Sequence, residues 1–432
     1  MKEPVDPEDV LVSRAGEDND FRELLLAKPR EAIEKEFGIT LDEDHEIHVH
    51  EETYASTHVV LPPRSKLSEA ERKAARTGAA SLEFLRETLY DPAPPARPAR
   101  ESVGARCTAA ASETLARAGR EGIRRGLAFL ESTIDGNGAW HCIRFNTADP
   151  DIPRHFERPP FVSALCVLAL ESCDEARAGA MCRATKKYLA DTIEYPGFWR
   201  YYSHLPHDLD STALCSLVIG NHPWILLRRN VPRILENRDE EGRFLTWVLA
   251  EDEPDVVSKF RLESDPVVNA NVIAYLGDHR ETKASQRWLE ALLREGGVEG
   301  SSKWYPDAVA IYYAIARAVI RVQPALDRLR PMLADRILGL SDKSGGFGNV
   351  LQTAQAVSAL GSLGGLASSD AEHHVERIMN AQREDGSWPE LLAFGDQFLK
   401  WGAVGRIGHG SEAVTSAFCI EALARLVKTL RD

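Results

Sequence analysis

Apolar residues recur at helical spacing through the chain from about residue 105 onward. Six alanine-rich apolar stretches each follow a short loop that carries an aromatic residue. These stretches predict helices over Phe161–Leu170, Ser211–Leu217, Val267–Leu276, Ala308–Ala318, Thr353–Leu363 and Ser411–Leu426. The loops before them contain Gly138-Ala139-Trp140, Gly197-Phe198-Trp199, Gly242-Arg243-Phe244, Ser302-Lys303-Trp304, Gly345-Gly346-Phe347 and Gly386-Ser387-Trp388. Their spacing, roughly 40–60 residues, is the size of a helical-hairpin repeat.

The repeat predicts an all-α domain over residues 106–432, built from six helical hairpins. Six hairpins can close into an (α/α)6 barrel whose inner helices line a central cavity. An open helical solenoid is the alternative arrangement. Six units, together with an acidic residue expected to face the cavity, favour the closed barrel.

The first 105 residues have a different pattern and predict a separate small α+β module. Residues 1–17 are expected to be disordered, and residues 18–90 to hold the module and a following helix. A helical pattern runs from Asn19 to Phe37 and stops at Gly38, and strand-like pieces follow at residues 46–50 and 58–61. A second helix is predicted over residues 67–89. The proline-rich stretch 91–105 is a linker and marks the domain boundary.

Charge supports this division and narrows the class of partner. The net charge is −14, and residues 1–60 hold 17 acidic and 6 basic side chains, a balance of −11 that leaves −3 for the rest. A nearly neutral main domain behind an acidic front argues against a nucleic acid partner.

The composition also indicates a cellular location. The seven cysteines form no C-x-x-C pair and lie mostly in apolar runs, so we expect reduced core thiols in a cytoplasmic protein. No stretch of eighteen apolar residues predicts a transmembrane segment.

The segment His207–Leu214 holds the strongest candidate chemistry. Asp208 and Asp210 stand one residue apart at the start of an apolar helix, after an aromatic cluster. Close carboxylates resist joint ionisation, and burial resists it further, so one of them is a candidate Brønsted acid. His207 and His204 are candidate hydrogen-bond partners of Asp210. The alternative is that Asp208 or Asp210 caps the helix.

Metal chemistry has weaker support. His204, His207 and Asp208 could share a Zn²⁺, but a proline separates the histidines and no cysteine is near, so no metal site is predicted. The chain has no D-D-x-x-D motif for a Mg²⁺-bound diphosphate. No cofactor is therefore expected, with Mg²⁺ left open for a diphosphate substrate. Basic side chains considered for such a diphosphate are Arg144, Arg200, Lys259 and Arg261, although surface salt bridges are the commoner role.

Two motifs carry a resemblance to a known family. Gln382-Arg383-Glu384-Asp385-Gly386-Ser387-Trp388 matches the Q-x-x-D-G-x-W "QW" motif of triterpene cyclases. Asp208-Leu209-Asp210-Ser211-Thr212-Ala213 is similar to their D-x-D-D-T-A motif, with Ser211 in place of the third Asp. Residues 105–432 thus resemble class II terpene cyclases of the squalene–hopene and oxidosqualene type, reduced to a single α/α barrel.

The resemblance implies a protonation-initiated cyclisation of an isoprenoid-type substrate, the activity of an isomerase or intramolecular lyase. It implies that Asp210 is the acid, with Asp208 and His207 beside it. Carbocations are stabilised by aromatic faces, and the residues proposed to line the substrate are Trp199, Tyr201, Tyr202, Trp304 and Tyr312.

The front end has a resemblance of its own. Asp20-Phe21, Pro29-Arg30-Glu31-Ala32, Phe37-Gly38-Ile39 and His58–Pro63 are similar to the nitrile hydratase leader peptide-like domain. The resemblance implies a possible protein partner bound through residues 18–63. The alternative function follows from it: a non-catalytic carrier or scaffold barrel, recruited through this module to a natural-product or peptide-maturation pathway.

Overall fold

The structure is a computed structural model that describes residues 11, 14–16, 18–38, 40, 47–49, 109–147, 151–249, 262–343, 345–396 and 407–431. The chain divides into two compact units, Met1–Tyr90 and Asp91–Asp432, and each is described by itself. The predicted strand at residues 58–61, the helix at 67–89 and the linker at 91–105 lie outside the described residues.

Residues 19–37 form two helices where one was predicted. Helix α2 (Asn19–Ala27) begins at the cap Asp18, whose side chain accepts a hydrogen bond from the Phe21 amide at 3.0 Å. Lys28 then leaves the helical conformation, because the proline ring of Pro29 disfavours it in the preceding residue. Helix α3 (Pro29–Phe37) starts at this proline and ends at Gly38, which has a left-handed φ of 62°.

Two further expectations for the first unit are corrected. Residues 14–16 are helical although they fall in the stretch predicted as disordered, and Ala15 is buried in a small cluster with Phe21, Leu25 and Ala32. Residues 47–49 belong to no strand, although alternation of polar and apolar residues predicted one there. The segment is short and lacks a described partner strand to pair with.

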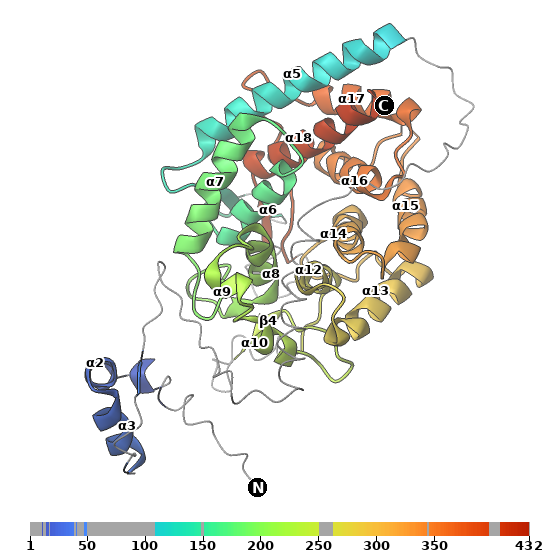
Figure 1. Cartoon of the computed structure of the whole chain (residues 1–432). Coiled ribbons are helices and arrows are strands. Elements are labelled where there is room, and N and C mark those ends of the chain that lie inside the picture. Colours follow the sequence, from blue (N-terminus) through green and yellow to red (C-terminus); the bar gives the residue numbers. More distant parts are fainter. Residues whose placement is uncertain are drawn as a thin grey trace, which may run out of the picture. The chain divides into compact units, whose positions relative to one another are not determined.

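The second unit is built around a ring of six helices in the described ranges. They are α6 (Pro160–Leu170), α8 (Leu209–Val218), α12 (Pro266–Leu276), α14 (Ala308–Arg321), α16 (Val350–Leu363) and α18 (Glu412–Thr429). Each packs against the next, and α18 packs against α6, so the ring closes (Figure 1). The six predicted helices are therefore confirmed, with bounds that shift by a few residues.

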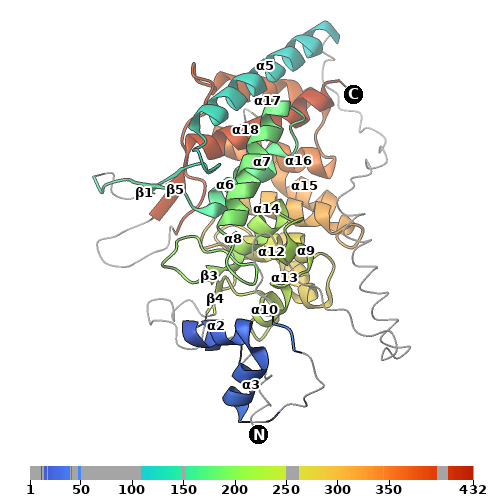
Figure 2. The same cartoon turned by 60° about the vertical axis from the view of Figure 1, so that its left-hand side comes forward.

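An outer layer of longer or more polar helices covers the ring. It consists of α5 (Ala109–Thr133), α7 (Ala176–Asp191), α13 (Lys283–Glu295), α15 (Arg330–Leu338) and α17 (Ser368–Asn380). Each packs on one or two ring helices, and α5 lies along α17 and α18 in both views (Figures 1 and 2). The ring helices α6 and α12 bury nearly all their residues, whereas the outer helix α13 buries one face only, as expected for an amphipathic helix.

Short elements join the layers. Helices α9 (Pro223–Leu226) and α10 (Val231–Glu236) follow α8, and the short 3-10 helices η1 (Arg280–Thr282) and η2 (Asp327–Leu329) precede α13 and α15. No helix in the described ranges has both the length and the apolarity that crossing a bilayer requires.

Five short strands were not predicted, because two to five residues are too few for a clear alternation. Strands β1 (Cys142–Asn146), β2 (His155–Glu157) and β5 (Ile407–Gly410) form an antiparallel sheet in the order β2-β1-β5. Strands β3 (His207–Asp208) and β4 (Trp247–Val248) form a second antiparallel pair. Arg144 on β1 lies opposite His409 on β5, so the larger sheet joins the two ends of the second unit.

The aromatic loops are fastened to the ring by a repeated hydrogen bond. In five of the six loops, the amide of the aromatic residue donates to a polar side chain on the ring helix that follows. The pairs are Trp140–Ser163, Trp199–Thr212, Phe244–Asn269, Phe347–Thr353 and Trp388–Ser416, at 2.9–3.3 Å. The sixth aromatic residue, Trp304, lies in a loop with a different arrangement.

The tryptophan side chains add a second repeated bond. The indole Nε1 of Trp140, Trp199 and Trp388 donates to the carbonyl of Leu130, Leu189 and Ile378, ten residues earlier at the end of an outer helix. These three indoles are fully buried. Since buried indole N–H groups need an acceptor, the bond orients each ring and ties an outer helix to the ring.

The last loop contains one further fastening. The Gln382 Nε2 donates to the carbonyl oxygens of Gly122 on α5 and Gly386, at 2.9 and 3.0 Å. Gly386 has a φ of +90°, and a Cβ there would lie 2.5 Å from the Arg125 carbonyl oxygen. Only glycine satisfies both conditions.

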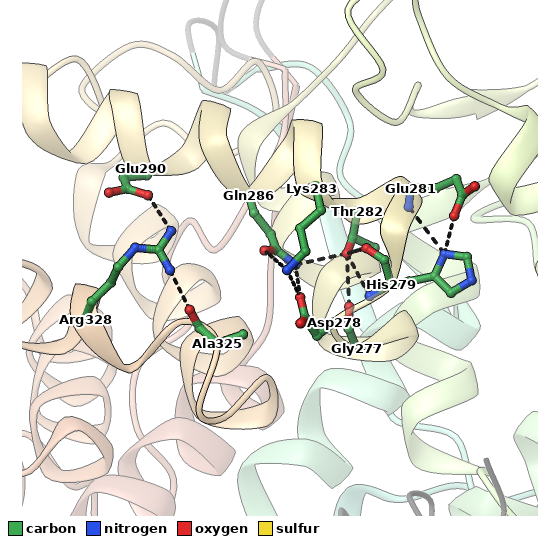
Figure 3. Close-up of polar contacts among 10 residues, drawn as sticks. All are labelled: Gly277, Asp278, His279, Glu281, Thr282, Lys283, Gln286, Glu290, Ala325 and Arg328. Carbon is green, nitrogen blue, oxygen red and sulfur yellow. Dashed lines mark hydrogen bonds and ion pairs between the residues drawn. The ribbon is translucent and has the colours of Figure 1, made fainter. Parts of the chain in front are cut away.

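Side-chain caps also hold the outer corner between α12 and α13, as Figure 3 shows. The Thr282 hydroxyl donates to the Gly277 and His279 carbonyl oxygens and accepts from Gln286 Nε2 at 3.0 Å. In the same view, Arg328 Nη2 donates to Glu290 on α13 at 2.6 Å. This corner is thus held by bonds among its own residues, and these bonds do not involve the partners of Asp210.

We expect Gly386→Ala to lower the melting temperature well below that of Gly364→Ala. Both glycines have left-handed φ values, +90° and +75°, and alanine there costs about 1–2 kcal/mol. A Cβ at Gly364 meets no atom within 4 Å, whereas one at Gly386 meets the Arg125 backbone. The clash adds ~1–3 kcal/mol. Scanning calorimetry measures the difference, and equal melting temperatures for the two variants would contradict it.

Candidate active site

Asp208 is the N-cap of α8 and is held by backbone donors on both oxygens. Its Oδ1 accepts from the Ser211 amide at 2.6 Å and its Oδ2 from the Tyr201 amide at 3.1 Å. The side chain is buried, and burial raises its pKa to about 7 against the pull of these donors. The capping alternative raised by the sequence is therefore realised at Asp208.

Asp210 lies in the first turn of α8 and does not cap the helix. Its Oδ2 accepts from the Tyr305 hydroxyl and its Oδ1 from Asn271 Nδ2, both at 2.7 Å. Burial raises the pKa of Asp210, while the Tyr305 and Asn271 donors and the nearby Arg317 charge lower it. The two neighbouring carboxylates thus have different roles, since Asp208 positions the helix and Asp210 faces side chains from other parts of the ring.

The donors to Asp210 continue into a polar chain. Asn271, on α12, also accepts from Arg317 Nη1 on α14 at 2.7 Å. The amide is therefore oriented with its nitrogen toward Asp210 and its oxygen toward the guanidinium. Three ring helices in sequence, α8, α12 and α14, each contribute one member.

A small cavity borders this chain. It is lined by Asn271, Tyr305 and Arg317 and by Leu165, Val267, Ala310, Tyr313, Ala314, Gln355, Ala393, Phe394 and Phe418. Its volume is about 20 Å³, room for roughly one water molecule. The two partners of Asp210 therefore lie on the cavity wall, and most of the remaining wall is apolar or aromatic.

His207 has a different partner from the one proposed. Its Nε2 lies 2.8 Å from Glu194 Oε2, and burial lowers its pKa. The described hydrogen-bond partners of Asp210 are Tyr305 and Asn271 instead of His207 or His204. His204 stacks on the Tyr202 ring, with the planes 7° apart. A catalytic role for His207 stays a prediction, and its bond to Glu194 gives that role no added support.

Ser211 occupies the position of the missing third carboxylate. Its amide donates to Asp208, and its fully buried hydroxyl has no hydrogen-bond partner among the described residues. Thr212, next to it, accepts from the Trp199 amide at 3.2 Å. The loop before α8 and its first turn are thus bonded at two points, through Thr212 and Asp208.

None of the five proposed lining residues belongs to the described wall of the cavity. Trp199 is fully buried in the loop bond described above, and Tyr312 is buried on α14. Trp304 Nε1 donates to Glu263 at 2.7 Å, with Lys303 over its ring. Tyr201 and Tyr202 bond to His409 and Glu157. Substrate binding by these five stays a prediction, and the aromatic wall is made by Tyr305, Tyr313, Phe394 and Phe418.

His409 joins a second polar cluster that the sequence did not reveal. Its Nδ1 lies 3.0 Å from the Tyr201 hydroxyl and 3.6 Å from Glu157, and its ring stacks on Phe394. Burial lowers the pKa of His409. Arg144 pairs with Glu157 at 3.0 Å, because β1, β2 and β5 bring these residues together.

The basic residues considered for a diphosphate are engaged where they are described. Arg144 pairs with Glu157, and Arg200 Nε pairs with Glu194 at 2.9 Å. Lys259 and Arg261 lie outside the described residues. Within the described ranges, no three His, Cys, Asp or Glu side chains are grouped as metal ligands would be.

Comparison with solved structures identifies the fold. A protein from Actinoplanes superposes with a TM-score of 0.59 and 19% identity, over 72% of this chain and 100% of that chain. Type II terpene cyclase MstE from Scytonema, as a variant bound to geranylgeranyl dihydroxybenzoate, gives 0.57 and 16%, over 73% and 99%. The chain has a type II terpene cyclase-like fold.

The apo form of MstE agrees, with a TM-score of 0.55 and 17% identity over 72% of this chain and 99% of that chain. No protein-family model and no curated protein matches the sequence. The likeness therefore extends to the fold, and the chemistry rests on the residues of this chain.

We expect Asp208→Asn to change how stability depends on pH. The folded-state pKa of about 7 exceeds the ordinary value of 3.8, so the folded protein keeps a proton that the unfolded chain releases between them. The stability that this group contributes is present below pH ~4 and is lost as the pH rises through about 7. The free energy of unfolding of the wild type should therefore fall relative to that of the variant as the pH rises over this range.

Thermal unfolding across pH 4–8 measures the difference in free energy of unfolding between the two proteins. The contributions of the other buried carboxyls drop out of this difference, because both proteins contain them. Asp174→Asn, at an exposed position, is the control. A difference that stays constant with pH would show that Asp208 is ionised throughout.

Proposed function

We propose that this protein catalyses a protonation-initiated cyclisation of an isoprenoid-type substrate, with Asp210 as the general acid. The observation that carries the proposal is the geometry of Asp210: a half-buried carboxyl whose two hydrogen-bond donors, Tyr305 and Asn271, line an apolar and aromatic cavity. The fold shared with MstE, which binds geranylgeranyl dihydroxybenzoate as substrate, supports the same reaction class.

In the proposed reaction, the Asp210 proton passes to one carbon of an alkene, or to an epoxide oxygen. The alkene electron pair forms the new C–H bond, the neighbouring carbon becomes cationic, and Asp210 is left as a carboxylate. The Tyr305 hydroxyl and Asn271 amide donate to that carboxylate, so they stabilise the product of proton transfer more than the neutral acid. Both therefore strengthen Asp210 as an acid.

The cation then propagates through ring closure and ends by loss of a proton to water or by capture of water with loss of its proton, and a proton from solvent returns Asp210 to the acid form. Tyr305, Tyr313, Phe394 and Phe418 form the aromatic part of the cavity wall and are the rings that would stabilise the cation. No cofactor is required, because the proton on Asp210 is the reagent. We further propose that the ring and its outer helices form an (α/α)6 barrel, whose interior holds the substrate.

Substrate entry requires the cavity to widen. About 20 Å³ holds a single water, far less than an isoprenoid chain needs. Closure around a bound substrate then excludes water from the cation.

We expect Asp210→Asn to abolish cyclisation. Wild type and variant are incubated with geranylgeranyl diphosphate, farnesyl diphosphate, squalene and geranylgeranyl dihydroxybenzoate, and products are separated by mass spectrometry. Loss of a general acid lowers the rate by about 10²–10⁴-fold. Asp335→Asn, at an exposed position on α15, controls for handling.

Equal product formation by Asp210→Asn would refute the acid assignment. If wild type turns over none of the four substrates, the alternative of a non-catalytic barrel recruited through residues 18–63 gains instead. The two functions are then separated by partner-protein binding with and without those residues.

We expect Tyr305→Phe to retain cyclisation at a lower rate. The change removes one donor to Asp210 and so raises its pKa, which weakens the acid. A hydrogen bond to a charged group is worth about 1.5–3 kcal/mol, so kcat should fall by roughly ten- to a hundredfold. Tyr195→Phe, which removes an exposed hydroxyl, should leave kcat unchanged. An unchanged kcat in Tyr305→Phe would exclude this supporting role.

A further inference from the structure

One wall of the cavity is more polar than hydrocarbon cyclisation requires. Asn271, Arg317 and Gln355 come from the successive ring helices α12, α14 and α16 and line the same small space. The donors needed by Asp210 are accounted for by Asn271 and Tyr305. Arg317 and Gln355 therefore call for a separate explanation.

Arg317 carries a charge without a direct counter-charge in the described part of the chain. Its Nη1 donates to Asn271, and its guanidinium carbon lies 5.1 Å from the Tyr313 ring centre. The nearby Glu421 is engaged by the Tyr313 hydroxyl at 2.7 Å and by Arg425 at 3.0 Å. A half-buried cation in this position is costly unless an anion joins it.

Gln355 presents a buried amide with no partner among the described residues. The residue is 5% exposed, lines the cavity, and makes no hydrogen bond to any residue in those ranges. Other buried amides on the ring behave differently: Asn269 accepts from Phe244 and donates to two carbonyl oxygens. The Gln355 amide atoms are not among the fully enclosed polar atoms of the described residues, so they reach the cavity and can bind a ligand there.

We propose that Arg317 and Gln355 form a subsite for a carboxylate carried by the substrate. The guanidinium supplies parallel N–H donors that match two carboxylate oxygens, and the Gln355 amide supplies another donor. That the ligand is a substrate rests on the proposed function, whereas the subsite itself rests on the cavity wall.

The chemistry of the wall favours a carboxylate over a diphosphate. Arg317 is the single cation among the described residues of the wall, and it matches one negative charge. A diphosphate carries more charge and more oxygens than one guanidinium and one amide can satisfy.

The test compares three fifteen-carbon compounds that differ in the head group: farnesoic acid, farnesol and farnesyl diphosphate. Calorimetric titration at pH 8, where the acid is ionised, measures each dissociation constant for wild type and for Asp210→Asn. We expect the acid to bind at least about tenfold more tightly than the alcohol, in line with a charged hydrogen-bonded pair. The diphosphate should bind no more tightly than the acid.

Matched variants locate the subsite. Arg317→Met should remove the preference for the acid, Arg317→Lys should keep part of it, and Gln355→Glu should abolish acid binding by placing a negative charge beside it. Farnesol binding should survive in all three, which shows that each variant is folded. Arg321→Met changes the arginine one turn further along α14, already paired with Glu171 at 3.7 Å, and should leave the preference intact.

The proposal is overturned if acid and alcohol bind equally, if neither binds, or if the preference survives Arg317→Met or disappears in Arg321→Met. These outcomes are independent of turnover. If the preference for the acid depends on Arg317 but no cyclic product forms, the subsite is retained and the cyclase is rejected. If cyclisation depends on Asp210 but the acid is not preferred, the cyclase is retained and the subsite is rejected.

Discussion

The bond from a loop amide to the ring helix that follows it, made in five of the six loops, is the interaction on which the second unit depends. A ring of apolar helices packs through nonspecific surfaces, and such surfaces alone leave each helix free to slide or rotate. In five of the six ring helices, one buried hydroxyl or amide bound to the preceding aromatic loop fixes both motions. The buried indoles then set the distance between ring and outer layer. Because this unit of outer helix, aromatic loop and ring helix repeats, successive ring helices are related by similar geometry, and the ring can close.

The candidate site uses the same device. Thr212 and Asp208 fasten the first turn of α8 to the loop at Trp199 and Tyr201, so the direction of Asp210 is determined by the fold. On the neighbouring ring helix α12, Asp265 plays the matching part. It caps α12, binds the Ser302 hydroxyl at 2.7 Å, and Ser302 in turn accepts from the Tyr305 amide. The cap Asp208 thus positions Asp210, and the cap Asp265, through Ser302, positions Tyr305, so that the two side chains can form their hydrogen bond.

The repeat, the six ring helices and the two carboxylates could be predicted, because they depend on local periodicity and a short motif. The break at Pro29 was also readable, since proline at the first turn starts a helix, but the apolar pattern continued across it and masked the signal. Tyr305, Asn271, Arg317 and Gln355 could not be assigned. They lie 61 to 145 residues from Asp210 in the sequence, and only the packing of successive ring helices brings them to one cavity wall, where Tyr305 and Asn271 bond to Asp210. The five short strands depend on the same long-range contacts.

The continuous path from Asp210 through Asn271 to Arg317 has a consequence for how such a protein can evolve. One amide joins the group that supplies the proton to the group that carries a fixed charge, so neither can be altered in isolation. A replacement at Arg317 that suits another ligand also changes the acidity of Asp210. Conversely, a more acidic Asp210 is ionised more often, and its negative charge alters the electrostatic field at the Arg317 site. New specificities are therefore reached more readily through the apolar wall, at Leu165, Val267 or Ala310, where size changes without disturbing proton affinity.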